Sequence, residues 1–358
     1  MGCIAILLLA DKSIDRTGVS GAAWIPFAWM FFAASRFPSR WLEGSRSTAT
    51  VATMAEGSPL DRLVFTGLIA LALMVLYRRR LNWIGWVQAN PWLFLLVFYS
   101  AVSVLWSDYP FVAFKRLIKS YGNLLMVMII LTEQDPRNAL GWIMRQLAYI
   151  LLPLSILYIK FYPELGRAYH MGRPMYTGVA NQKNSLGQTC LVLGLYFFWT
   201  LLFLPTRRSG AIQRPSLFVY AAVLPMLLWL LRMSDSATSQ IALILGTALL
   251  AASKTTAVRG RPGILVSMVL VAAAGLATMI ILFDVQMLVI QAVGRDPSLT
   301  TRVPMWFTLL SMANRPLIGT GFESFWMGPR LYTLTGMFGV SNAHNGYLEV
   351  YLSLGLAG

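Results

Sequence analysis

Long apolar runs separated by short polar or basic stretches dominate this chain of 358 residues. An α-helix needs about 20 predominantly apolar residues to cross the hydrocarbon core of a bilayer. The pattern therefore predicts an all-α, polytopic membrane protein with about ten spanning helices. These helices are expected near residues 18–34, 62–77, 91–107, 111–131, 139–161, 185–204, 216–233, 239–252, 263–283 and 345 to the end.

Composition supports membrane insertion and excludes several soluble classes. Apolar residues make up 57% of the chain and charged residues only 12%, whereas about a quarter of a soluble domain is charged. The mean hydropathy of +0.63 agrees with this. The formal net charge is +15, but the cations lie between apolar runs, which favours anionic lipid over nucleic acid as a partner. With two cysteines and two histidines, we expect no disulfide framework, no metal site and no cofactor.

Short basic loops predict the orientation of the chain. Clusters near residues 12–16, 78–80, 137, 207–214 and 254–261 fall on one side if the spans alternate, and the positive-inside rule makes that side cytoplasmic. The opposite, periplasmic side then carries loops 35–61, 162–184 and 284–344. We expect a single membrane domain over residues 1–358. Both ends of the chain lie within apolar runs, which is typical of a fragment of a longer protein.

Residues 284–344 form the longest interruption of the hydropathy pattern and carry the densest candidate chemistry. Long loops are uncommon unless they bind or catalyse something. Apolar residues between Trp306 and Met312 predict a short amphipathic helix. A helical hairpin that rests on the membrane surface is the structural alternative, and it is compatible with a functional loop.

His344 lies where this loop meets the last span, and it is a candidate proton acceptor near neutral pH. It can equally cap or line the start of the last helix. Asn345, beside it, is a candidate substrate ligand, and it also marks a helix entry.

Arg295 and Arg302 of the same loop are not explained by positive-inside bias. A guanidinium group matches phosphate oxygens in a bidentate way and keeps its charge. We therefore consider both as phosphate ligands. Pairing with Asp296 or Glu323, or snorkelling to the interface, is their structural alternative.

Three cations, Lys115, Arg116 and Lys119, lie in the expected span 111–131, with both lysines on one helix face. A cation at the bilayer centre costs roughly 2.5–3.5 kcal/mol. These three lie within about 10 residues of the outer end, from which they reach the headgroup region. The neighbouring sequence offers only Asp108 to neutralise them. An anionic ligand at the outer leaflet and simple snorkelling are the two interpretations.

Two further polar segments carry groups suited to phosphates and sugar hydroxyls. These groups are Arg167, Tyr169, Lys183 and Asn184 around loop 162–184, and Ser234, Asp235 and Ser236 between two spans. An ordinary solvated loop and hydroxyl groups that cap the next helix are the structural alternatives. The sequence has no Walker A loop, GxSxG elbow or Asp-rich cluster, so a soluble nucleotide donor is poorly supported.

Taken together, these segments resemble the O-antigen ligase and polymerase superfamily, most closely its exopolysaccharide-production branch. The resemblance rests, in chain order, on residues 24–26, 103–108, 112–116, 159–167, 183–187, 234–239, 294–306, 319–326 and 344–349. It covers nearly the whole chain, with a ligase-like core over about residues 100–358.

The resemblance implies a bacterial inner-membrane glycosyltransferase of the helical C-type fold, which works at the periplasmic face without metal or nucleotide sugar. Such enzymes transfer a glycan from an undecaprenyl-diphosphate carrier to an acceptor hydroxyl, with membrane lipids around them and polysaccharide export or chain-length proteins as partners. The family's functional histidine and periplasmic arginine correspond to His344 and Arg302. We expect Arg302 to bind the leaving diphosphate, and His344, supported by Glu323, to accept the proton.

Two positions depart from the family pattern. Many members carry an arginine in the serine-rich turn that corresponds to residues 234–239 here, whereas the nearest guanidinium group in this chain is that of Arg232. Directly before Arg302, Thr301 stands where glycine is commoner in the family. A transporter or flippase for the same lipid-linked glycan is the alternative function, although no convincing inverted repeat is seen. A non-catalytic scaffold in a polysaccharide assembly complex is a third. The sequence does not distinguish a polymerase from a ligase, and it does not identify the sugar or the acceptor.

Overall fold

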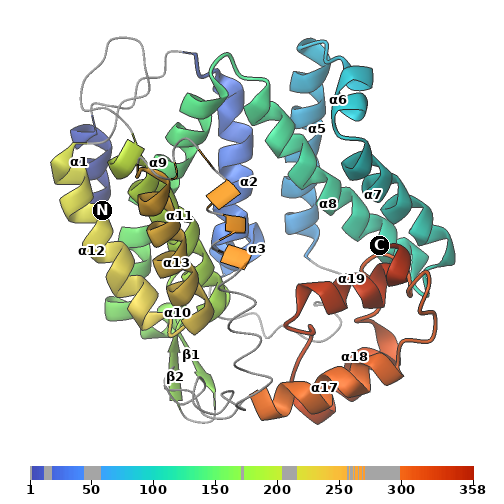
Figure 1. Ribbon diagram of the computed structural model, residues 1–358. Coiled ribbons are helices and arrows are strands. Elements are labelled where there is room, and N and C mark those ends of the chain that lie inside the picture. The colour runs from blue at the N-terminus through green and yellow to red at the C-terminus, as the bar shows by residue number, and fades with distance from the viewer. Residues whose placement is uncertain are drawn as a thin grey trace. The chain divides into compact units, whose positions relative to one another are not determined.

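The computed structural model describes residues 2–11, 18–43, 58–170, 173–203, 216–255 and 299–358, together with a few positions between 258 and 270. Within these ranges the chain is predominantly helical (Figure 1). The Cα positions divide the chain into two compact units. The first unit comprises Met1–Thr48 and Met126–Asp284, and the second comprises Ala49–Leu125 and Val285–Gly358.

The first unit is a helical bundle with a small β-hairpin at one end (Figure 1). Helix α11 packs against α12 and α13, and α12 also packs against α9. The elements are α1 (Gly2–Ala10), η1 (Gly21–Ala23), α2 (Trp24–Ala34), α3 (Pro38–Glu43), α9 (Pro136–Phe161), α10 (Pro163–Gly166), β1 (Arg167–His170), β2 (Arg173–Tyr176), α11 (Lys183–Phe203), α12 (Leu217–Met233) and α13 (Ala237–Ser253).

Helix α9 is the most buried helix of the candidate membrane spans. Two residues, Asp135 and Pro136, determine where this helix begins. Pro136 occupies the first turn, where its missing N–H costs nothing. The Asp135 carboxylate accepts hydrogen bonds from the N–H groups of Arg137 and Asn138 at 3.1 and 3.0 Å. A cap of this kind contributes about 1 kcal/mol. The buried face of α9 joins a core shared with α11 and α12.

The hairpin is a departure from the all-α chain that the sequence predicts. Strands β1 and β2 pair antiparallel, with Arg167 opposite Tyr176. The N–H groups of Thr177 and Gly178 both donate to the Gly166 carbonyl, at 2.9 and 3.1 Å. These bonds close the base of the hairpin, so the polar segment satisfies its backbone groups by pairing with itself, which hydropathy does not report.

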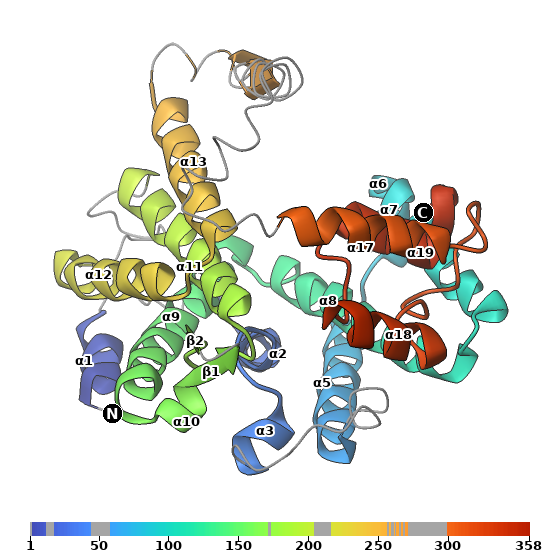
Figure 2. The same cartoon turned by 90° about the horizontal axis from the view of Figure 1, so that it is seen from below.

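The second unit contains two groups of helices. The elements are α5 (Pro59–Arg78), α6 (Trp83–Ala89), α7 (Pro91–Val102), η3 (Ser103–Trp106), α8 (Pro110–Leu131, whose last residues count with the first unit), α17 (Leu299–Ser311), α18 (Gly328–Phe338), α19 (Gly346–Leu354) and η4 (Gly355–Ala357). In both views α17, α18 and α19 lie close together (Figures 1 and 2). They share a small core that includes Met305, Leu309, Phe325, Leu334 and Leu352. The amphipathic helix expected around Trp306 is confirmed by α17.

The apolar helices identify a membrane protein. Within the described residues, α5, α9 and α11 are each long and apolar enough to cross a bilayer. Helices α6 and α7 meet at a bend of 104° and qualify only as a pair, while α2, α12 and α13 are apolar but shorter. The count of about ten spans and the periplasmic position of loop 284–344 stay predictions. The span expected at 263–283 lies largely outside the described residues.

Candidate functional site

In the second unit, three segments that are far apart in the sequence meet: the turn after α7, the loop between α17 and α18, and helix α19. The N–H groups of Thr320 and Gly321 donate to the carbonyls of Leu352 and Ser353 at 3.1 and 2.9 Å. The Thr320 carbonyl accepts a hydrogen bond from the Asp108 N–H at 3.3 Å. The structure therefore joins three of the segments that the sequence analysis singled out.

Two glycines allow this close approach. Gly319 and Gly321 have positive φ angles of 66° and 95°. A Cβ atom on Gly319 would lie 2.4 Å from the Ser353 backbone, and one on Gly321 would lie 2.6 Å from Ser107. Both the conformation and the space therefore require glycine.

The same loop supplies the partners of Arg116, a cation of α8. The Arg116 guanidinium donates to the Glu323 carbonyl at 2.5 Å and lies 4.0 Å from the Glu323 carboxylate. It also lies 3.4 Å from the sulfur of Met327. The Glu323 side chain is 57% exposed, so its carboxylate stays accessible to a ligand. Two predicted site residues, Arg116 and Glu323, are thus brought together.

Asp108 pairs with two arginines that the sequence analysis did not single out. It forms an ion pair with Arg330 of α18, and its other oxygen lies 3.9 Å from Arg315. In the neighbouring sequence only Asp108 could neutralise the α8 cations, whereas in the structure the loop after α17 brings the Glu323 carboxylate to Arg116. No local pattern signals these pairs, since Asp108 and Arg330 are 222 residues apart.

Lys115 and Lys119, the other cations of α8, lie over aromatic rings. Lys115 Nζ is 4.5 Å from the centre of the Phe111 ring, and Lys119 Nζ is 4.9 Å from that of Phe65. Cation–π contacts of this kind contribute about 0.5–1 kcal/mol at exposed sites. The rings position the ammonium groups and leave their charge in place.

His344 lies in the loop before α19, and this loop is held from both sides. The Glu349 carboxylate accepts hydrogen bonds from the Ala343 N–H and, at 2.7 Å, from the Trp326 indole. The Trp306 indole of α17 donates to the Ala343 carbonyl at 2.9 Å. Both polar groups of Ala343 are therefore bound, while the neighbouring His344 is exposed. Glu349 is a positioning residue for which the sequence analysis gave no role.

Asn345 caps α19, which agrees with the helix entry that the sequence indicates at this residue. Its side-chain oxygen accepts hydrogen bonds from the N–H groups of Tyr347 and Leu348 at 3.1 and 3.4 Å. The His344 N–H donates to the Asn342 side chain at 3.1 Å. The substrate contact expected of Asn345 stays a prediction.

Arg302 lies in the first turn of α17, four residues before Trp306. The Trp306 indole donates to the carbonyl of Ala343, the residue before His344, and so connects α17 to the loop that carries His344. For Arg302 the structure describes the backbone alone, and Arg295 lies outside the described residues.

Left-handed backbone conformations mark several of these positions. In the part of the chain that the structure describes, four non-glycine residues have positive φ: Arg80 (48°), Asp235 (48°), Glu323 (53°) and His344 (51°). Such conformations are uncommon outside glycine and cost of the order of 1–3 kcal/mol. They gather at ligand clamps and active sites, and three of these four are predicted site residues.

In the first unit, Arg167 has a structural partner. Its Nε and Nη2 atoms donate to the Ile159 carbonyl at 3.0 and 2.8 Å, and its guanidinium lies over the Tyr176 ring at 5.5 Å. Ile159 belongs to the last turn of α9, so this cation satisfies a carbonyl at the helix end. Tyr169, on the same strand, is 67% exposed.

A pocket of about 460 Å³ lies between the hairpin and the serine-rich turn of the first unit. It is lined by Pro174, Met175, Tyr176, Lys183, Arg232, Met233 and Asp235. Lys183 Nζ lies 3.3 Å from a carboxylate oxygen of Asp235. The structure thus joins Lys183 and Asp235 and adds Arg232 beside them, which gives the pocket two cations and one carboxylate.

The serines of this turn are engaged within the fold. Ser234 Oγ donates to the Leu231 carbonyl at 2.7 Å, and Ser236 Oγ lies 3.1 Å from Ser239 Oγ. Ser234 and Ser236 are buried, whereas Asn184, in the first turn of α11, is exposed. Their contacts with a ligand stay predictions.

Residues 220–358 match the family model described as O-antigen ligase. The C-terminal part of the chain is therefore similar to the O-antigen ligase family. This confirms the resemblance to the O-antigen ligase and polymerase superfamily, which implies glycosyl transfer in glycan assembly. No curated protein and no solved structure matches the chain.

Some of the candidate residues lie inside the range that matches the O-antigen ligase model, and others lie outside it. Arg302, Glu323, His344 and Glu349 lie inside the matched range, whereas Arg116 lies outside it. The ion pair between Arg116 and Glu323 therefore connects the matched range to helix α8, which precedes it in the sequence and contributes Arg116 to the same unit. Among the described residues, no group of three or more His, Cys, Asp or Glu side chains is arranged to hold a metal ion.

Proposed function

We propose that this protein is a metal-independent glycosyltransferase that polymerises or ligates an oligosaccharide carried on undecaprenyl diphosphate, at the periplasmic face of a bacterial inner membrane. The O-antigen ligase match supports the class of reaction, and the apolar helices support the membrane location. One observation carries the assignment of the site. The second unit holds the Glu323 loop and the peptide before His344 in a single hydrogen-bonded framework.

The proposed reaction is a single displacement with inversion. The acceptor hydroxyl oxygen attacks the anomeric carbon and forms the new glycosidic bond, while the bond from that carbon to the diphosphate breaks. The bonding electrons leave with undecaprenyl diphosphate, and the proton of the hydroxyl moves to the His344 imidazole. A positioned general base of this kind contributes about 10²–10⁴-fold.

Fixed cations stabilise the charge that develops on the leaving diphosphate. Arg302 is the proposed principal ligand, with Arg295, Arg116 and the two lysines of α8 as auxiliary cations. Glu323 orients Arg116 through the contacts at 2.5 and 4.0 Å, and its exposed carboxylate supports His344.

The pocket of the first unit is the proposed contact for the glycan. Lys183, Arg232 and Asp235 offer donors and an acceptor for sugar hydroxyls or phosphates, and Tyr176 offers a ring for a sugar face. Arg232 supplies the guanidinium group that the serine-rich turn itself lacks. Arg167, Tyr169 and Asn184 remain proposed contacts around it.

Transfer by the purified protein tests the catalytic assignment. With lipid-linked oligosaccharide as donor, His344→Ala and Arg302→Ala are each expected to lower turnover by about 10²-fold or more. Product length is read by gel and mass spectrometry. His170→Ala is the matched control, because it removes the other histidine of the chain and is expected to keep turnover. Near-normal turnover of both site variants would contradict the mechanism.

The glycan made by a deletion strain separates the remaining alternatives. Short single repeats indicate a lost polymerase, whereas long unattached chains indicate a lost ligase. Translocation of glycan by the purified protein without new glycosidic bonds would favour a transporter and would refute transfer.

A further inference from the structure

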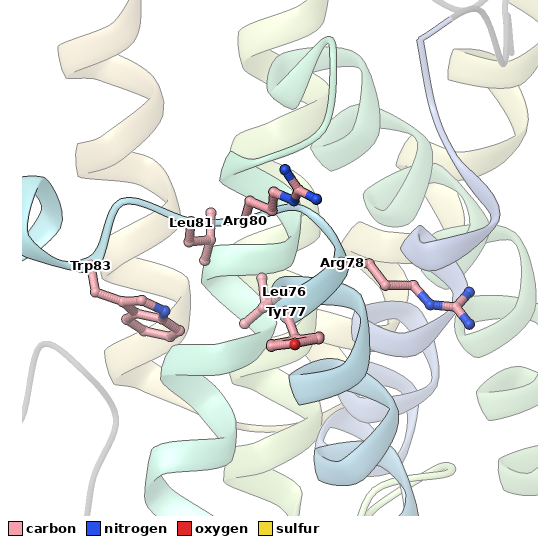
Figure 3. Close-up of a pocket in the computed structure, with 6 residues that line it drawn as sticks. All are labelled: Leu76, Tyr77, Arg78, Arg80, Leu81 and Trp83. Atoms are coloured by element: carbon pink, nitrogen blue, oxygen red, sulfur yellow. The ribbon is translucent and has the colours of Figure 1, made fainter.

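A second basic site lies in the second unit, at the turn between α5 and α6, and the proposed transfer reaction does not use it. A pocket of about 530 Å³ is lined there by Leu76, Tyr77, Arg78, Arg80, Leu81 and Trp83. Figure 3 shows these side chains spread along the turn, with Trp83 at one end, Arg78 at the other, and Leu76 and Tyr77 between them. The lining thus combines two cations, two aromatic rings and two leucines, and it includes no carboxylate.

The backbone of this turn is fixed by its own hydrogen bonds. The Arg80 N–H donates to the Tyr77 carbonyl at 3.0 Å, and the Trp83 N–H donates to the Leu81 carbonyl at 3.1 Å. The Asn82 side chain then caps α6 by accepting from the Gly85 N–H at 3.0 Å. Arg80 itself has a φ of 48°, a costly conformation for arginine. This reversal brings Arg80 and Trp83 to the same pocket as the last turn of α5.

The lining suits an anion that carries an apolar part. Leu76 is fully buried and forms an apolar floor. A guanidinium group binds phosphate oxygens through paired hydrogen bonds, and tyrosine and tryptophan are enriched at membrane interfaces. Helix α5, which ends at Arg78, is long and apolar enough to cross a bilayer. Its end is therefore expected at the depth of the lipid headgroups.

We propose that this pocket binds the phosphate of an anionic phospholipid headgroup. Arg80 is the primary ligand and Arg78 the second cation, while Trp83 and Tyr77 pack against the glycerol and the upper acyl chain. Free phosphate offers the same oxygens, but it would leave the apolar floor and the aromatic walls unused. Positive-inside bias accounts for arginines in such a turn, yet it requires neither a pocket nor a left-handed arginine.

Native mass spectrometry of the full-length protein in detergent tests the proposal. The protein is titrated with phosphatidylglycerol or with phosphatidylcholine, and we expect preferential retention of phosphatidylglycerol. Arg78→Gln and Arg80→Asn are each expected to weaken this retention about fivefold, because an arginine near an anionic surface contributes about 1 kcal/mol. Asparagine is chosen at position 80 because it tolerates the left-handed conformation.

Arg79→Gln is the matched control, because it removes the same charge from the same tripeptide, and Arg79 does not line the pocket. It is expected to keep lipid retention, whereas Trp83→Ala is expected to lower it. An equal loss in all three arginine variants would show a general charge effect and overturn the site. Displacement of the lipid by millimolar inorganic phosphate would overturn the lipid assignment in favour of a free phosphate site. Equal retention of both lipids would also overturn it.

Discussion

Removal of Asp11 tests whether the core of the first unit depends on a buried ion pair. Asp11 follows α1, and its carboxylate lies 3.7 Å from the guanidinium of Arg145 in the middle of α9. Both side chains are 0% exposed. The Tyr149 hydroxyl donates to the same carboxylate oxygen. Asp11→Ala therefore leaves a guanidinium charge in the core without this carboxylate.

The expected cost is large because the charge stays buried. Removal of one partner of a buried ion pair destabilises proteins by about 3–5 kcal/mol. The total free energy of unfolding of a domain is about 5–15 kcal/mol. Tyr149→Phe removes one hydrogen bond and keeps the ion pair, so it is expected to cost about 0.5–1.5 kcal/mol. The two variants therefore separate the charge from the hydrogen bond.

Reversible unfolding of the purified protein in mixed micelles, followed by tryptophan fluorescence as denaturing detergent is added, measures these differences. Asp235→Asn is the matched control, because it removes a carboxylate that is 77% exposed and paired with Lys183. Exposed pairs contribute about 0–1 kcal/mol, and asparagine tolerates the left-handed φ at this position. An Asp11→Ala variant that unfolds within about 1 kcal/mol of the unmodified protein would refute the reasoning.

Two further predictions concern the framework of the second unit. Gly321→Ala is expected to destabilise the loop after α17 by about 2 kcal/mol or more, because φ is 95° and the new Cβ would lie 2.6 Å from Ser107. The measurement is the rate of limited proteolysis in this loop, which should be higher in the variant than in the unmodified protein. Gly336→Ala, with open space around the new Cβ, is the control and should resist proteolysis normally. Glu349→Ala is expected to lower turnover by about 10²-fold through misplacement of His344, with partial recovery in Glu349→Gln; equal turnover in Glu349→Ala and the unmodified protein would contradict this positioning role.

Hydropathy predicted most described helices because the length of an apolar run sets the length of a spanning helix. The expected span 62–77 corresponds to Pro59–Arg78, and 139–161 corresponds to Pro136–Phe161. The hairpin at Arg167–Tyr176 was not predicted, since its strands satisfy their backbone groups within a polar segment. Local composition distinguishes apolar from polar segments, but it does not report pairing inside a polar one.

The candidate site was predictable as a set of segments but not as a set of contacts. Residue types alone singled out Arg116, Glu323 and His344. The carboxylate that reaches Arg116 comes from Glu323, in a loop 207 residues further along the chain. The same holds for Glu349, whose role becomes visible only through its bonds to Ala343 and Trp326. Partner choice at such distances is a property of the folded chain.

The left-handed residues link the framework to the proposed chemistry. A conformation that costs about 1–3 kcal/mol persists only where surrounding bonds hold it. At His344 these bonds come from Glu349 and Trp306 to Ala343, and at Glu323 from Arg116 to the backbone carbonyl. These hydrogen bonds therefore fix the direction in which the exposed side chains of Glu323 and His344 point. If the framework were weakened, His344 could relax to an ordinary backbone conformation, and its imidazole would leave the position that proton transfer requires.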